Sequence, residues 1–310
     1  MGMDPASSQP SPPTFALSKL RCGKDPGHVR GVDCAYRVAW SINPHMKVGA
    51  VNWRRACAQH RAFRRALLAA GAELLELPFV HGAYDCVFAK DNAVLLERRG
   101  RMRALLASPV FGERQQEQHA RARMLEALGF EVLGPPPSHF EGGDLAVLPG
   151  VRGALLGYGQ RSSRHAAGRL ERFLDAPVTP LELTDPHLYH LDTALHVLSD
   201  GTALVCAEAF TLEALRTLAR TEGIQRVVPV PYEEALRFGV NLVEVGRAVL
   251  VGGRVPQVEA LLHALGRWPV TVPLEQFHHA GGSAACLASR VHHAGRVATS
   301  DTTAMRSTSV

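Results

Sequence analysis

Apolar residues recur at helical spacing in several stretches of the chain, and each stretch is followed by a short apolar segment typical of a β-strand. In the first stretch, Trp53–Ala70 places Ala, Leu and Phe among arginines, Gly71 ends the helix, and Glu73–Leu77 forms a strand. Glycine is the expected stop because it adopts the left-handed conformation without strain. The pattern predicts four more helix and strand pairs: Glu113–Leu128 with Glu131–Leu133, Ser163–Leu174 with Val178–Leu183, Thr211–Arg220 with Arg226–Pro231, and Val258–Leu265 with Val270–Leu274.

The helix stops fall at positions 71, 129, 176, 223 and 266, with spacings of 58, 47, 47 and 43 residues. A period of this size is typical of repeat architectures, in which each unit buries its apolar face against its neighbours. Each unit continues into two apolar runs joined by a turn, such as the Asp200-Gly201 hairpin signal. We therefore predict a five-bladed α/β propeller of ββαβ-type repeats, whose last unit is completed by a strand around Tyr36–Ile42.

The composition is that of an ordinary globular protein of 310 residues with a net charge of +5. We expect a disordered leader over 1–18, a single catalytic domain over 19–293 and a flexible tail over 294–310. Scattered arginines argue against a nucleic-acid partner, and the lack of a long apolar run argues against a membrane partner. The start of the chain does not read as a secretory signal, and the six cysteines are expected to be reduced thiols, so we expect a cytoplasmic protein.

Unusual polar residues occupy the same place in each unit, just after the helix-linked strand and at the start of the hairpin. They are Asp85 and Asp91, Glu141 and Asp144, His190 and Asp192, Asn241, and Cys286. If the units are related by rotation, these equivalent points converge on the axis. Residues that are far apart in the sequence are then expected to meet in one cavity.

Cys286 follows Gly281-Gly282-Ser283, and glycines before a thiol allow a tight turn and the close approach of a substrate. A free cysteine is more often a small buried apolar residue, but its position in the repeat favours a nucleophile. His190 and Asp192 share one face if they lie on a strand, which would place a proton shuttle beside a carboxylate. The alternative for His190 is a hydrogen-bonded core histidine.

Two adjacent glycines separate Glu141 from Asp144, and such a pair costs backbone entropy unless something must pass close to the chain. A simple turn is the alternative. Asp85 and Asp91 bracket a short apolar segment. Several carboxylates at the mouth of a cavity suit a cationic substrate, and a planar guanidinium presents its donors to them in a rigid fork.

From about Tyr36 to Val291, the chain resembles the guanidine-modifying (pentein) superfamily, which includes arginine deiminases, dimethylarginine dimethylaminohydrolases and amidinotransferases. The motifs that carry the resemblance are Ile42-Asn43-Pro44, Asp85-x-Val-Phe-x-x-Asp91, Glu141-Gly-Gly-Asp144, Gly157-x-x-x-Arg161, His190-Leu-Asp192 and Gly-Gly-x-x-x-Cys286. The chain departs from the dimethylaminohydrolase pattern at Lys90, where an acid is usual, at Gly159, where a serine is usual, and in having Asp192.

The resemblance implies a role for each matching residue. Cys286 would be the nucleophile, His190 the general acid and base, and Glu141 the carboxylate that orients the histidine and contacts the substrate. Four residues that match family positions would bind the substrate. The carboxylates that bind its guanidinium would be Asp91, Asp192 and Asp85, and Arg161 would bind its α-carboxylate. Arg114 is a weaker candidate for the task of Arg161.

The resemblance further implies a hydrolase of arginine or an N-methylated arginine that forms a covalent thiouronium on the cysteine. The products would be citrulline and ammonia or a methylamine, with no metal and no organic cofactor. An amidinotransferase with an amine acceptor and a non-catalytic propeller that binds a macromolecule are the alternatives. A small guanidino substrate is the expected partner, and a homodimer is possible on the same resemblance.

Overall fold

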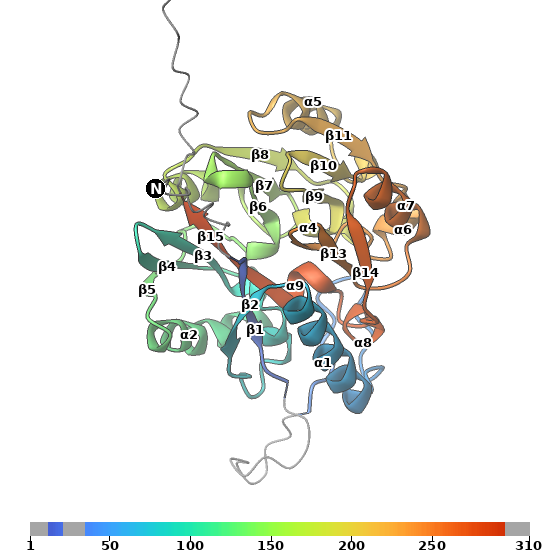
Figure 1. Cartoon of the computed structure of the whole chain (residues 1–310). Coiled ribbons are helices and arrows are strands. Elements are labelled where there is room, and N and C mark those ends of the chain that lie inside the picture. Colours follow the sequence, from blue (N-terminus) through green and yellow to red (C-terminus); the bar gives the residue numbers. More distant parts are fainter. Residues whose placement is uncertain (1–11, 21–34, 295–310) are drawn as a thin grey trace, which may run out of the picture.

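The computed structural model describes residues 12–20 and 35–294, which form a mixed α/β fold (Figure 1). The strands are β1 (Thr14–Ser18), β2 (Glu73–Leu77), β3 (Ala93–Arg98), β4 (Arg101–Leu106), β5 (Glu131–Leu133), β6 (Leu145–Val147), β7 (Ala154–Tyr158), β8 (Val178–Glu182), β9 (Leu195–Val197), β10 (Thr202–Val205), β11 (Arg226–Pro229), β12 (Val243–Val245), β13 (Ala248–Val251), β14 (Trp268–Thr271) and β15 (Ala288–Ala294). The α-helices are α1 (Trp53–Ala69), α2 (Gly112–Ala127), α3 (Ala167–Leu174), α4 (Leu191–Ala194), α5 (Leu212–Arg220), α6 (Tyr232–Ala235), α7 (Pro256–Ala264), α8 (Glu275–His278) and α9 (Ala284–Leu287).

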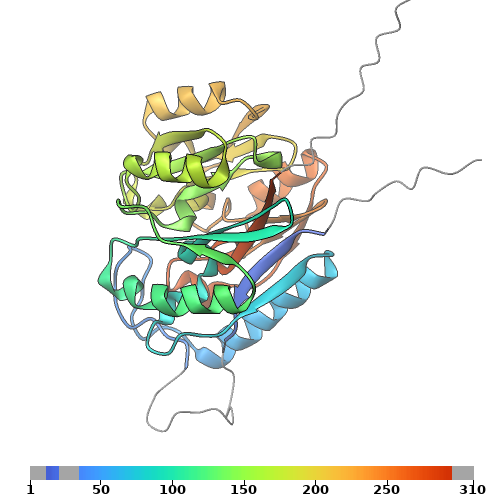
Figure 2. The ribbon, with the colours of Figure 1, turned by 90° about the vertical axis from the view of Figure 1, so that its left-hand side faces the viewer.

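The strands repeat one pairing pattern. Strands β3 and β4 pair antiparallel and β4 and β5 pair parallel, and the same order recurs in β6–β8, β9–β11 and β12–β14. A fifth unit joins the two ends of the chain, because β15 pairs antiparallel with β1, which pairs parallel with β2. Figure 2 shows β1, in blue, beside β15, in dark red.

This fifth unit corrects two expectations. The segment 36–42 is not a strand, and the completing strand is β1, which lies inside the region that we expected to be a disordered leader. The sequence Thr14–Ser18 is short, but four of its five residues are buried, because it lies between β2 and β15 in the sheet. The strand was not predicted because the sequence before it is rich in serine and proline, which is typical of a disordered leader.

The units do not close into one hydrogen-bonded ring within the described part of the chain. A parallel pair between β15 and β3 joins two units into a six-stranded sheet, whereas the other three units are separate three-stranded sheets. The mixed α/β class is therefore confirmed, and the closed five-bladed propeller is not.

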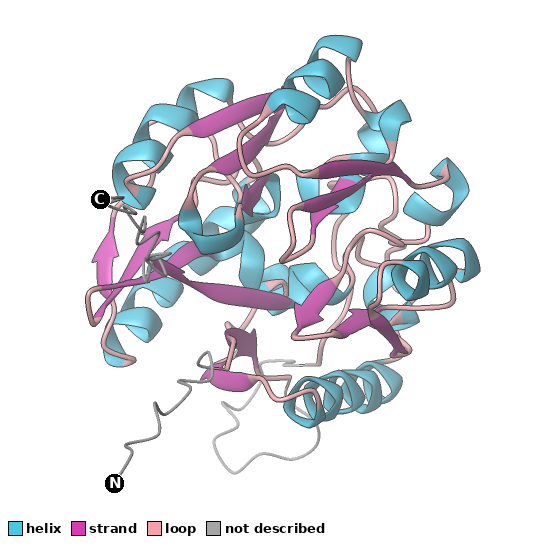
Figure 3. Cartoon of the chain, turned by 45° about the horizontal axis from the view of Figure 1, so that its top comes forward, coloured by secondary structure: helices cyan, strands magenta, loops and turns pink. Residues whose placement is uncertain are grey.

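Each long helix lies between the second and third strands of its unit along the chain, and the helices surround the sheets in Figure 3. Helix α1 begins at Asn52, whose side chain accepts a hydrogen bond from the backbone N–H of Arg55 at 3.1 Å. The helix buries Phe63 and Leu67 completely in a core cluster, where each such side chain contributes about 1.5–3 kcal/mol. Helix α3 ends at Leu174 and is followed by Asp175, in the left-handed conformation with φ 50°, so it stops one residue before the expected Ala176-Pro177.

Residues 1–11 of the expected leader and residues 295–310 of the expected tail lie outside the described part of the chain. None of the helices that the structure describes combines the length and the apolar character that a membrane crossing requires. Cys86, Cys206 and Cys286 are free, as expected, but Cys57 is disulfide-bonded, so the expectation of reduced thiols is wrong for Cys57.

Candidate active site

The polar residues that the repeat aligned lie in short helical turns or loops directly before the first strand of each unit. They are Asp85 in η1 (Tyr84–Val87) and Asp91 in η2 (Ala89–Asn92) before β3, Glu141 and Asp144 at η3 (Gly142–Asp144) before β6, His190 and Asp192 at α4 before β9, Asn241 before β12, and Cys286 in α9 before β15. Segment η3 contacts both η2 and α4, and α9 contacts η2. Groups from all these units therefore meet in one buried site.

Cys286 is buried, and its Sγ lies 3.8 Å from both carboxylate oxygens of Asp192. The side-chain amide of Asn241 donates a hydrogen bond to the same sulfur at 3.2 Å. Burial raises the pKa of the Cys286 thiol well above its usual value, and the carboxylates of Asp192 and Asp91 raise it further. A cation placed among these groups would lower this pKa, because it would stabilise the thiolate.

The glycines before Cys286 make close contacts, but with protein groups. A Cβ at Gly281, whose φ is 87°, would meet the side chain of Asn43 at 2.4 Å, and one at Gly282 would meet the ring of Phe88 at 2.3 Å. The expected tight turn is present. The close approach that we attributed to a substrate is made by Asn43 and Phe88.

His190 is completely enclosed, with its Nε2 3.2 Å from Glu141 Oε2 and its Nδ1 3.8 Å from Asp91 Oδ1. Burial lowers the pKa of His190, but the carboxylates of Asp91, Asp144 and Glu141 outweigh burial and raise the pKa to about 9. The imidazole therefore carries a proton at neutral pH and can donate it. We expected His190 and Asp192 to lie on one strand, and this expectation is wrong. His190 caps the N-terminus of the one-turn helix α4, which contains Asp192.

Glu141 is the ionised partner of this histidine. Burial raises the pKa of Glu141, but the adjacent His190, and then the charges of Arg114 and Arg161, lower it to about 2. Asp144 has a different task, since its Oδ1 accepts a hydrogen bond from the backbone N–H of Leu191 at 3.0 Å. Burial raises the pKa of Asp144 to about 7.

Six buried polar atoms of Asp91, Glu141, Asp144 and His190 make no hydrogen bond of full geometry among the described residues, although some of them take part in the ion pairs with His190 and Arg161: Asp91 Oδ1, Glu141 Oε1 and Oε2, Asp144 Oδ2, and His190 Nδ1 and Nε2. Buried polar atoms without a partner are rare, because each one costs about 1–3 kcal/mol. Four of the six are carboxylate oxygens, which accept hydrogen bonds when they are ionised. The site is therefore prepared for a ligand that donates several hydrogen bonds.

The other carboxylates are partly occupied. Lys90 Nζ binds Asp192 Oδ2 at 2.8 Å. Lys90 departs from the dimethylaminohydrolase pattern, and its charge neutralises the aspartate beside the thiol of Cys286. Trp40 Nε1 donates to Asp85 Oδ2 at 2.7 Å, and burial raises the pKa of Asp85. Asp85 therefore already has a hydrogen-bond donor, whereas Asp91 Oδ1 has only the 3.8 Å ion pair with His190.

Arg161 lies against the site and between two aromatic rings, with its guanidinium carbon 4.4 Å from the Phe111 centroid and 4.8 Å from the Tyr189 centroid. Its Nη1 lies 3.6 Å from Glu141 Oε1, and its Nη2 donates to the carbonyl of Ile42. Stacked in this way, the guanidinium has a fixed orientation beside the carboxylate of Glu141.

Arg114 occupies a different place. Its Nη1 donates to Asp91 Oδ2 at 3.0 Å and its Nε donates to Glu117 Oε1 at 2.6 Å. All three side chains are buried. Arg114 thus holds Asp91 in position. From the sequence alone, Arg114 is only a weaker candidate for binding the substrate α-carboxylate.

Reasoning from sequence gave no role to Asn241, Lys90 or Glu117. Asn241 occupies the same position in its unit as His190 and Cys286 do in theirs, so the repeat carried a signal for it. Lys90 and Glu117 carried no such signal, because their partners depend on how the units pack.

Asp91, Glu141 and His190 could also approach one metal ion, since one ligand atom from each lies within 4.8 Å of the others. The charge of His190 and the adjacent Arg114 and Arg161 disfavour a second cation of high charge at this point. The expectation of a reaction without a metal stays a prediction.

The fold and the site define a mixed α/β protein with a buried cysteine, an imidazolium and several carboxylates around one point. No protein-family model matches the chain. The chain is 31% identical over 258 residues to the N(G),N(G)-dimethylarginine dimethylaminohydrolase of Mycobacterium tuberculosis, and the match covers 83% of each protein. It is 27% identical to the enzyme of the same name from Streptomyces coelicolor, over 82% of this chain and 93% of that enzyme.

Solved structures agree with this relationship. The N-terminal domain of ArgZ, a cyanobacterial arginine dihydrolase bound to its product, superposes with a TM-score of 0.81 at 26% identity, over 91% of this chain and 98% of that domain. A dimethylarginine dimethylaminohydrolase adduct with S-methyl-L-thiocitrulline shares the fold, with a TM-score of 0.69 at 17% identity over 89% of this chain and 98% of that one. The chain belongs to the dimethylarginine dimethylaminohydrolase family of guanidine-modifying proteins.

Proposed function

We propose that the protein hydrolyses the guanidinium group of arginine or of an N-methylated arginine through a covalent intermediate on Cys286. One observation carries the proposal. Buried carboxylate oxygens of Asp91 and Glu141 without a full hydrogen bond lie beside a protonated histidine, and the charge of Asp91 also acts on the thiol of Cys286. A guanidinium satisfies such a set, because it offers five N–H donors and one positive charge in a plane.

The first half of the reaction would use the charge of the substrate. The bound guanidinium lowers the pKa of Cys286, the thiol proton leaves to solvent, and the thiolate attacks the guanidinium carbon. His190 then gives its proton to the departing nitrogen. The C–N bond breaks, ammonia or a methylamine leaves, and the carbon stays on Cys286 as a cationic thiouronium.

The second half would use His190 as a base. The neutral imidazole takes a proton from water, and the resulting hydroxide attacks the thiouronium carbon. The C–S bond breaks, which returns the thiolate of Cys286 and releases a ureido product such as citrulline, with the surplus proton leaving to solvent. Glu141 would stabilise the imidazolium in both halves, since it lies 3.2 Å from Nε2.

Arg161 would select the tail of the substrate. Its guanidinium is fixed between Phe111 and Tyr189 and would bind the α-carboxylate of an amino acid. Agmatine, which lacks this carboxylate, would then be a poor substrate. The recurrence of one strand pattern in five units supports a five-bladed arrangement around this site.

The test is incubation of the purified protein with arginine, monomethylarginine, dimethylarginine and agmatine, followed by assays for ureido product, ammonia and methylamines. Mass spectrometry of the acid-quenched protein would then detect the adduct on Cys286. We expect the mass of an amidino-linked substrate after loss of one amine. If no guanidine is turned over and no adduct forms, the proposal is wrong.

A further inference from the structure

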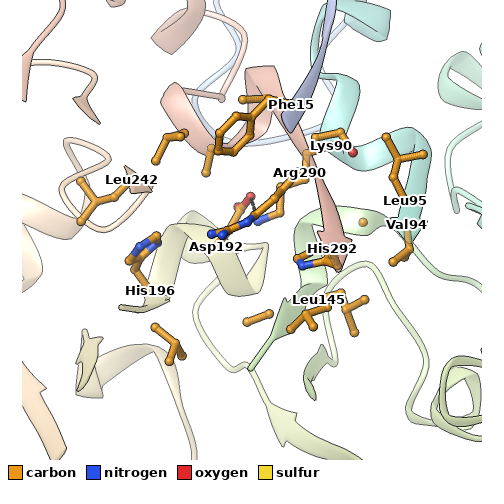
Figure 4. A pocket seen from close by; sticks show the side chains of 18 of the residues that line it. Phe15, Lys90, Val94, Leu95, Leu145, Asp192, His196, Leu242, Arg290 and His292 are labelled. Atoms are coloured by element: carbon orange, nitrogen blue, oxygen red, sulfur yellow. Dashed lines mark hydrogen bonds and ion pairs between the residues drawn. The ribbon is translucent and has the colours of Figure 1, made fainter. Parts of the chain in front are cut away.

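A second hollow lies next to the candidate active site. It is a cavity of about 120 Å³ lined by the first strand of every unit, β3, β6, β9, β12 and β15, and we refer to it as the axial cavity (Figure 4). Lys90 and Asp192 also line it, whereas Cys286, His190, Glu141 and Asp91 do not. The axial cavity is therefore distinct from the catalytic groups but shares the Lys90–Asp192 ion pair with them.

Arg290 supplies a positive charge to this cavity. Its guanidinium carbon lies 6.0 Å from the centroid of the Phe15 ring, and its side chain forms no hydrogen bond or ion pair with the described residues. The side chain is exposed although β15 runs through the middle of the molecule, so it faces the hollow. Partial desolvation by the cavity wall lowers the pKa of Arg290, and the charge of Glu244 opposes this shift.

The acidic groups at the cavity are already bound to other residues. Asp192 is paired with Lys90 at 2.8 Å. Glu244 accepts hydrogen bonds from Ser199 N at 2.7 Å, from Ser199 Oγ at 2.9 Å and from Arg267 Nε at 2.8 Å. Arg290 therefore forms no ion pair with either carboxylate, although the charge of Glu244 raises the pKa of Arg290.

Two histidines add hydrogen-bond donors to the same wall. His196 and His292 line the cavity, and Nε2 of His196 has no partner among the described residues. Burial, together with the charges of Lys90 and Arg290, lowers the pKa of both rings to about 3. Each imidazole is thus neutral and keeps one N–H to donate.

We propose that the axial cavity binds a small oxyanion, of the phosphate or sulfate class, on Arg290 with His196 and His292. A guanidinium fork binds such an anion through two parallel N–H···O bonds, and the neutral imidazoles complete the set with N–H donors. Asp192 lines the cavity and also contacts the thiol of Cys286, so Asp192 would lie between the bound anion and Cys286.

The test uses the full chain and does not depend on its activity. Isothermal titration with inorganic phosphate and with sulfate, at constant ionic strength, is carried out on the wild type, on Arg290→Gln and on Arg65→Gln. Arg65 is an exposed residue of helix α1, so its substitution removes the same charge at a distance from the cavity. We expect the dissociation constant to rise at least about tenfold in Arg290→Gln and to stay within about twofold in Arg65→Gln.

Two outcomes would overturn the proposal: equal binding by Arg290→Gln and the wild type, or no binding by the wild type up to ~50 mM of either anion. If Arg290→Gln does not fold, crystals of the wild type soaked in selenate decide the question by anomalous scattering. A selenium peak beside Arg290 supports the proposal. No peak, or a peak only beside Arg161, refutes it.

Discussion

A methyl group at Gly143 would enter the space between His190 and Asp91. A Cβ built on this glycine lies 2.5 Å from His190 Nδ1, 2.8 Å from Asp91 Oδ1 and 2.9 Å from His190 Cγ. The backbone of Gly143 does not have a positive φ, so alanine fits its conformation. The substitution Gly143→Ala therefore tests the packing of the site and little else.

The expected effect follows from the distances. Ordinary contact begins at 3.4 Å, so the ring of His190 must move by about 0.9 Å from the 2.5 Å contact. A displacement of about 1 Å between reacting groups costs on the order of 10²-fold in rate. Overpacking of this kind destabilises a core by about 1–3 kcal/mol, which a domain of this size tolerates.

The assay measures kcat for the guanidine that is turned over fastest, together with urea unfolding of the same preparations. Gly134→Ala is the matched control, because no atom lies within 4 Å of its added Cβ and its φ is not positive. We expect kcat to fall about 10²-fold in Gly143→Ala and to stay unchanged in Gly134→Ala. A Gly143→Ala protein that is folded and keeps kcat within about threefold of the wild type would refute the assigned position of His190.

Three further predictions follow from the contacts of the site. Cys286→Ser should lower kcat by at least ~10³-fold while the urea midpoint stays close to that of the wild type, and activity above a few per cent of wild type would exclude Cys286 as the nucleophile. Asn241→Asp places a carboxylate where an amide donates to Sγ at 3.2 Å, so it should raise the pKa of Cys286 and slow alkylation by iodoacetamide at pH 8; an unchanged rate would show that the contact is unimportant. The pKa of His190 is raised to about 9, so its stabilisation is complete below the unfolded value of about 6.5 and is lost as the pH rises through about 9. The difference in unfolding free energy between the wild type and His190→Asn should thus shrink by up to ~3 kcal/mol between pH 6 and pH 10, and a constant difference would contradict the assigned charge.

The local elements could be predicted because their signals are local. Strands Glu73–Leu77 and Glu131–Leu133 match the predicted bounds, and α1 and α2 match within one residue. Helical periodicity and a terminal glycine act over a few residues, so they are readable without a partner. Strand β1 was missed because its five residues gain their stability from two strands that are distant in sequence, β2 and β15.

The repeat also determined which residues would meet, since equivalent positions of related units lie at equivalent places in space. Asp91, Glu141, His190 and Cys286 could be grouped on that ground alone. Which group pairs with which was decided by the tertiary structure: Lys90 binds Asp192, Arg114 binds Asp91, and Arg161 lies between two rings. Ion pairing depends on separations of a few ångströms between residues that the chain places far apart, and only the packing of the units sets those separations.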